Sequence, residues 1–218
     1  MRARALIFDF DGLLLETEGA LFESWRELYD AHGTLLSTEE WASTIGTADS
    51  VDPMAELERR CGRRLDREWL QSVRRTRRDE LLDSLSPCEG VNEITEQALA
   101  LGLPMAVASS SPLEWVDTHL RRLGLRDLFC HLSCFGGTGA AKPAPDVYLG
   151  ALSLLGAAAE EVIAFEDSHN GLLAAKAAGL RCVVVPSPMT AQMDFQAADM
   201  VLTRLGEPPL EELIKALE

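Results

Sequence analysis

The sequence predicts an α/β fold, and three observations support this prediction. Short apolar runs alternate with helical patterns over residues 88–186. A further apolar run at residues 5–10 ends in Asp-Gly, and only helical patterns separate it from the later runs. Apolar strands that alternate with helices are typical of a parallel sheet covered on both faces. We therefore expect a Rossmann-like parallel-sheet core, residues 1–14 and 88–218, with an inserted all-helical cap, residues 15–87.

Each predicted element follows from a local pattern. Residues 5–10, ALIFDF, form a short apolar run that is typical of a buried strand. Residues 17–33 carry one apolar stripe at helical spacing. Residues 38–84 are helical in type, with a capping-like start in which Ser37 or Thr38 is paired with Glu40. The later helices are predicted over 91–101, 112–123, 145–155 and 170–178, and the later strands over 103–109, 128–135, 162–166 and 181–185. In such folds ligands bind at the carboxyl ends of the strands.

Charge and composition exclude several classes of function. The 218 residues carry a formal net charge of −15, which opposes binding to nucleic acid or to an anionic membrane surface. No apolar run approaches the roughly 20 residues of a membrane span, and the N-terminus is unlike a signal peptide. We therefore expect a cytoplasmic protein that binds neither nucleic acid nor membrane.

The five cysteines do not indicate a zinc site. Cys130 and Cys134 are four residues apart, but no second pair of ligands follows them. Their odd number and scattered positions are typical of reduced thiols.

Polar residues follow four of the predicted strands. The first are Asp9 and Asp11, in the segment DFDG. Two carboxylates this close repel each other unless a cation lies between them. A plain Asp-Gly turn is the alternative, whereas a calcium loop would need further oxygen ligands that are missing here.

The polar residues that follow the next two predicted strands favour the binding of an anion. Ser109, Ser110 and Ser111 come directly before Pro112, where hydroxyl and N–H groups at a helix start bind anions. A simple helix cap by Ser111 is equally compatible. Lys142, in AAKPAPDVY, places a compact positive charge ahead of a helix, although an ordinary surface lysine would look the same.

The fourth position is acidic again. Glu166, Asp167 and Ser168 follow the run VIAF, and a helix cap by Asp167 or Ser168 is the structural alternative. Taken together, carboxylate pairs, a hydroxyl cluster and one lysine at converging strand ends indicate magnesium and a phosphoryl group.

Four segments carry a resemblance to a known family. They are FDFDGLLLETE (8–18), VASSS (107–111), KPAPDVY (142–148) and FEDSHNG (165–171). In order and spacing they resemble the haloacid dehalogenase superfamily, and within it the β-phosphoglucomutase-like branch with a helical cap. The cap of that branch is matched here only in position and helical character.

The resemblance implies roles for the acids. Asp9 is similar to the nucleophile of the family, which forms an aspartyl-phosphate, and Asp11 is similar to its acid/base residue. The Mg²⁺ ligands would be the Asp9 side chain, the Asp11 backbone carbonyl and Asp167, with Glu166 supporting the ion through water. The hydroxyl of Ser109, the backbone N–H of Ser110 and the ammonium of Lys142 would bind the phosphoryl oxygens.

Departures from the family pattern narrow the activity. Residues 15–87 contain no lysine, which excludes the phosphonate-cleaving branch with its Schiff-base lysine. Thr47, Ala48 and Asp49 stand where an arginine-bearing segment is expected in the sugar-phosphate mutases. Glu16 replaces the more usual aspartate at the cap hinge. The dehalogenases lack the second aspartate, so Asp11 favours phosphate chemistry.

Residues 59–78 hold nine arginines against two acids. They either attract anionic substrates or form solvated helix faces paired with nearby acids, and we favour the second interpretation.

From these observations we expect a Mg²⁺-dependent phosphatase that hydrolyses a small phosphorylated metabolite through an aspartyl-phosphate. A phosphosugar mutase of the same superfamily is the alternative, and a non-catalytic regulator that binds phosphorylated ligands is the alternative from another class. The resemblance further implies a monomer.

Overall fold

The structure, a computed structural model, describes residues 3–42, 52–137 and 139–218. The chain divides into two compact units. One, the core unit, comprises Met1–Leu15 and Ser86–Glu218, and the other, the helical unit, comprises Glu16–Leu85. No helix in the described part of the chain is long and apolar enough to cross a membrane.

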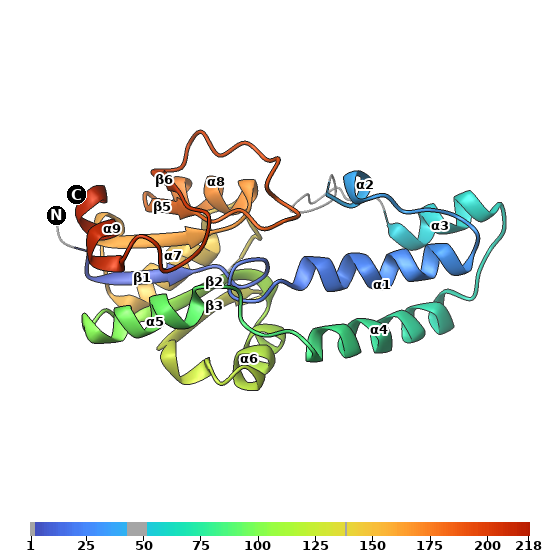
Figure 1. Ribbon diagram of the computed structural model, residues 1–218, viewed down its shortest axis with the longest axis horizontal. Helices are drawn as coiled ribbons and strands as arrows, with labels where there is room; N and C mark the ends of the chain where they lie inside the picture. Colours follow the sequence, from blue (N-terminus) through green and yellow to red (C-terminus); the bar gives the residue numbers. More distant parts are fainter. Residues whose placement is uncertain (1–2, 43–51, 138) are drawn as a thin grey trace. The chain divides into compact units, whose positions relative to one another are not determined.

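The core unit is built on a parallel sheet, as the sequence predicts (Figure 1). Its strands in spatial order are β3 (His131–Phe135), β2 (Met105–Pro112), β1 (Ala5–Phe8), β4 (Val162–Glu166), β5 (Arg181–Val184) and β6 (Met200–Val201). Strand β1 lies between β2 and β4, so the strand order reverses there. Ligands of open α/β sheets bind at such a reversal, outside the carboxyl ends of the strands.

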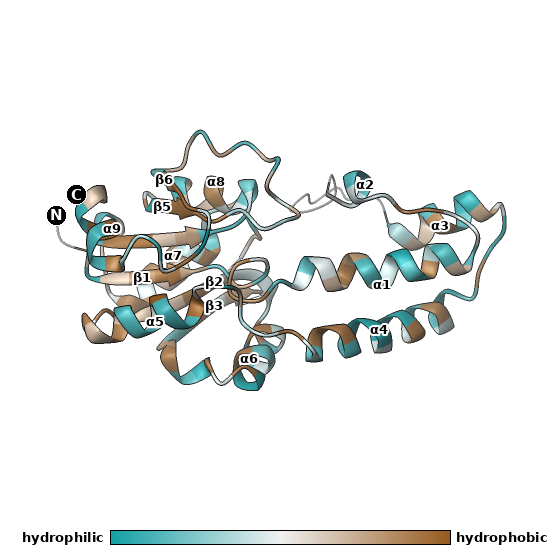
Figure 2. Ribbon diagram, in the orientation of Figure 1, coloured by the Kyte–Doolittle hydropathy of each residue, from teal (hydrophilic) through white to brown (hydrophobic). Residues whose placement is uncertain are grey.

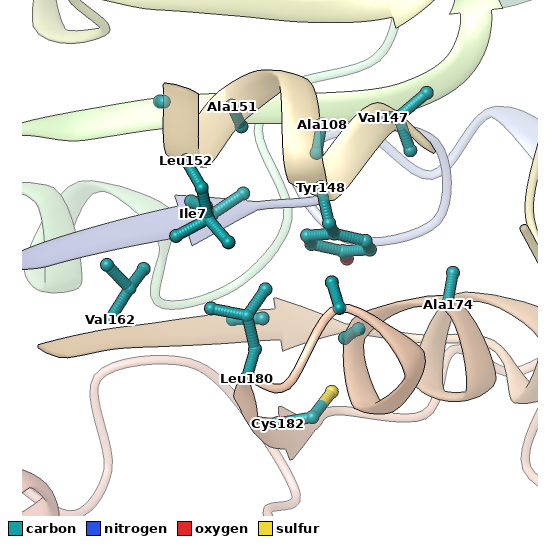
Figure 3. Close-up of a cluster of buried hydrophobic side chains, with 14 of the residues drawn as sticks. Ile7, Ala108, Val147, Tyr148, Ala151, Leu152, Val162, Ala174, Leu180 and Cys182 are labelled. Atoms are coloured by element: carbon teal, nitrogen blue, oxygen red, sulfur yellow. The ribbon is translucent and has the colours of Figure 1, made fainter. Parts of the chain in front are cut away.

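Strand β1 is buried on both faces of the sheet, which explains its uninterrupted apolar sequence. Ala5 and Ile7 point to one face, into a cluster with Tyr148 of α7 (Asp146–Leu155) (Figure 3). Phe8 points to the other face, where its ring stacks 4.9 Å from that of Phe165. In Figure 2, where the ribbon is coloured by residue hydropathy, strand β5 has the brown colour of hydrophobic residues.

The helices of the core unit cover both faces of this sheet. They are α5 (Val91–Ala100), α6 (Leu113–Arg122), α7, α8 (His169–Ala177) and α9 (Leu210–Leu217), with short 3₁₀ turns at Arg126–Leu128 and Ala159–Glu161. Helices α5 and α8 lie on opposite sides of the sheet (Figure 1). The sequence patterns predict α5 to α8 but neither α9 nor the two-residue strand β6.

The helical unit contains α1 (Thr17–Ala31), α2 (Thr38–Ala42), α3 (Pro53–Cys61) and α4 (Arg67–Asp83). Ser37 and Glu40 cap α2 reciprocally, each backbone N–H bonding the side chain of the other. Helices α1 and α4 pack side by side (Figure 1). The segment Thr47-Ala48-Asp49 lies outside the described residues.

The arginines of residues 59–78 largely pair with acids. The pairs are Arg59 with Glu56, Arg60 with Glu40 and Glu56, Arg67 with Asp52 and Glu58, Arg77 with Glu27 and Glu80, and Arg78 with Asp79. Arg74 differs, because its guanidinium lies 4.6 Å from the centre of the Trp25 ring. Burial and the neighbouring cations Arg78 and Arg75 lower the pKa of Arg74.

Gly90 is required where α5 begins. Its φ is +85°, and a Cβ there would lie 1.8 Å from the backbone oxygen of Leu205. Gly102 has a similar φ of +66°, but a Cβ there would meet nothing within 4 Å. We expect Gly102→Ala to cost about 1–2 kcal/mol of stability from backbone strain alone. Gly90→Ala should cost more than about 3 kcal/mol, because the backbone itself must also move.

Urea denaturation of the two variants beside the wild type measures this difference. Equal losses in the free energy of unfolding for Gly90→Ala and Gly102→Ala would contradict the close contact between Gly90 and Leu205.

Candidate active site

The polar side chains that follow β1 and β4 meet at the carboxyl edge of the sheet. Asp9 follows β1, and its backbone N–H bonds the carbonyl of Phe165 in β4 at 2.9 Å. Glu166 ends β4, and Asp167 follows it. Carboxylate oxygens of Asp9, Glu166 and Asp167 lie within 4.8 Å of one another, and all three residues are buried. The fold therefore brings together three of the acids that the sequence singles out.

Gly12 makes room for this acidic cluster. The chain turns sharply after β1, with φ +86° at Gly12, and a Cβ there would lie 2.2 Å from a carboxylate oxygen of Asp167. Only glycine combines this backbone conformation with so close an approach. The sequence left open whether the DFDG segment forms a turn or an acidic site, and the structure contains both the turn at Gly12 and the acidic cluster.

Lys142 lies among these acids. Its ammonium bonds Oδ1 of Asp9 and, at 2.6 Å, Oε1 of Glu166, and its side chain is only 7% exposed. Burial alone would lower the pKa of Lys142, but the carboxylates of Asp9 and Glu166 outweigh burial and raise it. Lys142 is therefore a buried, charged residue of the site and not an ordinary surface lysine.

One ammonium does not balance three carboxylates. The pKa of Asp9 is raised to about 8, chiefly by burial and also by the neighbouring Glu166 and Asp11, although Lys142 opposes the increase. The excess negative charge favours a bound cation, and carboxylate oxygens are the ligands that hard divalent cations prefer. The described residues of this cluster therefore fit a metal ion.

Glu166 is held by more donors than the sequence reveals. The hydroxyl of Tyr148 donates to Oε1 at 2.5 Å, and the N–H of Asp167 and the hydroxyl of Ser168 donate to Oε2. A Cβ on Gly171 would lie 2.0 Å from the Glu166 carboxyl group. The Tyr148 hydroxyl was not predicted, although Tyr148 ends the segment KPAPDVY that carries the family resemblance.

The three serines after β2 have separate partners. The hydroxyl of Ser109 accepts a bond from the N–H of Ser111 at 2.9 Å, and that of Ser110 accepts from the N–H of Lys142 at 3.1 Å. Ser111 does not cap α6, as the structural alternative supposed, because β2 extends to Pro112 and the helix begins one residue later. Ser168 does cap α8, by accepting from Gly171 N.

The side chain of Asp11 stays outside the acidic cluster. Its Oδ2 accepts a hydrogen bond from the hydroxyl of Ser111 at 2.6 Å, and its Oδ1 accepts from Nε1 of Trp115 at 3.0 Å. Nothing in the sequence patterns indicated Trp115. The two aspartates of DFDG therefore have different hydrogen-bond donors: an ammonium group for Asp9, and a hydroxyl and an indole N–H for Asp11.

The hydroxyl of Tyr148 should matter more for stability than that of a comparable buried tyrosine. Tyr148→Phe removes a bond to a buried carboxylate, so we expect a loss of about 1.5–3 kcal/mol. Tyr29→Phe removes a bond to the neutral carbonyl of Pro53 and should cost about 0.5–1.5 kcal/mol. Urea denaturation measures the free energy of unfolding of both variants. An equal or smaller loss of stability for Tyr148→Phe would contradict a strong hydrogen bond from Tyr148 to a charged Glu166 carboxylate.

The chain is similar to several known proteins over nearly its whole length. YhcW of Bacillus subtilis (strain 168) is 39% identical over 98% of this chain and 97% of its own. Hexitol phosphatase B of Escherichia coli (strain K12) is 32% identical over 96% of each chain. A crystal structure of a CbbY variant from Rhodobacter sphaeroides in complex with Xylulose-(1,5)bisphosphate has a TM-score of 0.76, with 29% identity over 94% of this chain and 96% of that one.

A family profile described as haloacid dehalogenase-like hydrolase matches residues 3–179. This span includes β1 to β4, the helical unit and every residue of the acidic cluster. The chain therefore belongs to the haloacid dehalogenase-like hydrolase family.

Proposed function

We propose that the protein is a Mg²⁺-dependent phosphatase that hydrolyses a small phosphorylated metabolite, such as a sugar phosphate, through an aspartyl-phosphate. The observation that carries the proposal is the buried cluster of Asp9, Glu166 and Asp167 with the Lys142 ammonium inside it. The names of the relatives support the substrate class, since one is a hexitol phosphatase and another binds a sugar bisphosphate.

The proposed Mg²⁺ ligands are the side chains of Asp9 and Asp167 and the backbone carbonyl of Asp11, with Glu166 acting through water. Mg²⁺ takes oxygen ligands and keeps several waters, which suits a site with few protein ligands. When bound, the ion would offset the negative charge of the cluster and of the phosphoryl group.

Asp9 is the proposed nucleophile, since its buried carboxylate belongs to the cluster and contacts the Lys142 ammonium. Its oxygen attacks phosphorus, the bond from phosphorus to the substrate oxygen breaks, and Asp11 gives its proton to that leaving oxygen. Asp11 then takes a proton from water as the water oxygen attacks the aspartyl-phosphate. The bond between phosphorus and Asp9 breaks, and inorganic phosphate leaves.

The phosphoryl oxygens would be bound by the hydroxyl of Ser109, the backbone N–H of Ser110 and the Lys142 ammonium. An ammonium group has three donor hydrogens, so Lys142 can bond Asp9 and a phosphoryl oxygen together. Donors placed before the reaction stabilise the charge that develops during transfer.

Asp9→Asn should abolish turnover. The amide is nearly the same size but is a poor nucleophile, so we expect a loss of at least about a thousandfold in kcat. The measurement is phosphate release from a panel of phosphorylated metabolites with Mg²⁺, with circular dichroism to verify folding of the variant. Retained activity in Asp9→Asn would refute the role of Asp9 as nucleophile.

The same panel separates the alternatives. Glucose 1-phosphate, with and without its bisphosphate, would yield an isomer instead of free phosphate if the protein were a mutase. No phosphate release from any compound would favour a non-catalytic regulator.

The dependence of the rate on Mg²⁺ tests the metal site. EDTA should abolish phosphate release, and added Mg²⁺ should restore it. Asp167→Asn should raise the Mg²⁺ concentration for half-maximal rate by about tenfold or more, because it removes one charged ligand. The matched control is Asp127→Asn, an exposed carboxylate outside the cluster, which should leave this concentration unchanged. Equal values for the two variants would contradict the assignment of Asp167.

A further inference from the structure

The carboxylate of Asp11 is held at both oxygens by one short segment of the chain. Ser111, near the end of β2, donates to Oδ2, and Trp115, in the first turns of α6, donates to Oδ1. Two bonds from opposite ends of the carboxyl group determine its position and the direction of its plane. Neither Ser111 nor Trp115 has a role in the proposed transfer of the phosphoryl group.

The indole of Trp115 is backed by buried rings. Its ring centre lies 4.3 Å from that of His119, at an interplanar angle of 73°, and His119 in turn stacks on Phe10 at 6.3 Å. His119 is 8% exposed and Phe10 is fully buried. The Nε1–H donor therefore belongs to a packed part of the core unit, beside the strand end that carries Asp11.

The two contacts hold the Asp11 carboxyl group from both of its oxygens. The indole N–H of Trp115 can only donate, and it donates to Oδ1. The hydroxyl of Ser111 donates to Oδ2. Turning the carboxyl group out of its present plane would therefore weaken both hydrogen bonds at once.

The geometry points to Trp115 and Ser111 as positioning residues that hold the Asp11 carboxyl group in one orientation. This inference rests on the proposed function, in which Asp11 first gives a proton to the leaving oxygen and then takes one from water. The orientation matters because proton transfer requires the donor and acceptor atoms within hydrogen-bond reach.

The basicity of the leaving group separates positioning of Asp11 from a purely structural role. An alkoxide leaving group, as in a hexitol phosphate, needs the proton from Asp11, whereas p-nitrophenolate leaves without one. The value of kcat/KM covers the steps up to departure of the leaving group. We expect Trp115→Phe, which keeps an aromatic ring against His119, to lower kcat/KM about tenfold or more for an alkyl phosphate and less than about threefold for p-nitrophenyl phosphate.

Three further variants complete the experiment. Ser111→Ala should show the same selective loss, and Ser111→Thr, which retains the hydroxyl, should restore most of the activity. Trp69→Phe is the matched control, because Trp69 is 61% exposed on α4 and should leave both substrates unaffected. Thermal denaturation identifies any variant that fails to fold. If Trp115→Phe does not fold, the contrast between Ser111→Ala and Ser111→Thr decides the question.

The outcomes are distinct. A selective loss with the alkyl phosphate supports the inference. If a folded variant loses kcat/KM equally with both substrates, or with neither, the inference about Trp115 and Ser111 is overturned. The proposed phosphatase activity is then unaffected. A wild-type protein that hydrolyses neither substrate overturns the proposed function and this inference with it.

Discussion

Burial of a lysine among carboxylates is the constraint on which the rest of the site depends. Removing charges from water is costly, and a buried acid is tolerated only with partners. The Lys142 ammonium supplies two such contacts, to Asp9 and Glu166, and Glu166 gains three further donors from Tyr148, Asp167 and Ser168. Even so, burial, together with the neighbouring Glu166 and Asp11, raises the pKa of Asp9 above its ordinary value. A site of this kind can hold a cation.

The backbone is shaped to allow this concentration of charge. Strand β1 lies between β2 and β4, so three strands present their carboxyl ends side by side. Gly12 and Gly171 then leave the space that Asp167 and Glu166 occupy, because a Cβ at either glycine would overlap a carboxyl group. The same glycines that look like turn and helix residues in the sequence are therefore required by the acids that approach them.

The two aspartates of the DFDG segment acquire different chemistry from their surroundings. Asp9 lies in the buried acidic cluster beside the Lys142 ammonium, which suits the role of nucleophile proposed for it. Asp11 lies two residues further on, and its side chain is held by a hydroxyl and an indole N–H. Enzymes commonly separate the roles of two nearby carboxyl groups in this way, by environment and not by residue type. Ser111, which supplies the hydroxyl, contributes to this separation although its position in the sequence resembles that of a helix cap.

The sequence by itself determined the parallel sheet, the alternation of strands and helices, and the family, because apolar periodicity, turn residues and short motifs are local signals. It also singled out Asp9, Asp11, Lys142, Glu166 and Asp167. It did not reveal α9 or β6, and it suggested a helix cap for Ser111. The tertiary structure decided which groups meet: Lys142 bonds Asp9 across 133 positions of sequence, and Trp115 bonds Asp11 across 104. Such contacts follow from the order of strands in the sheet, which no local pattern encodes.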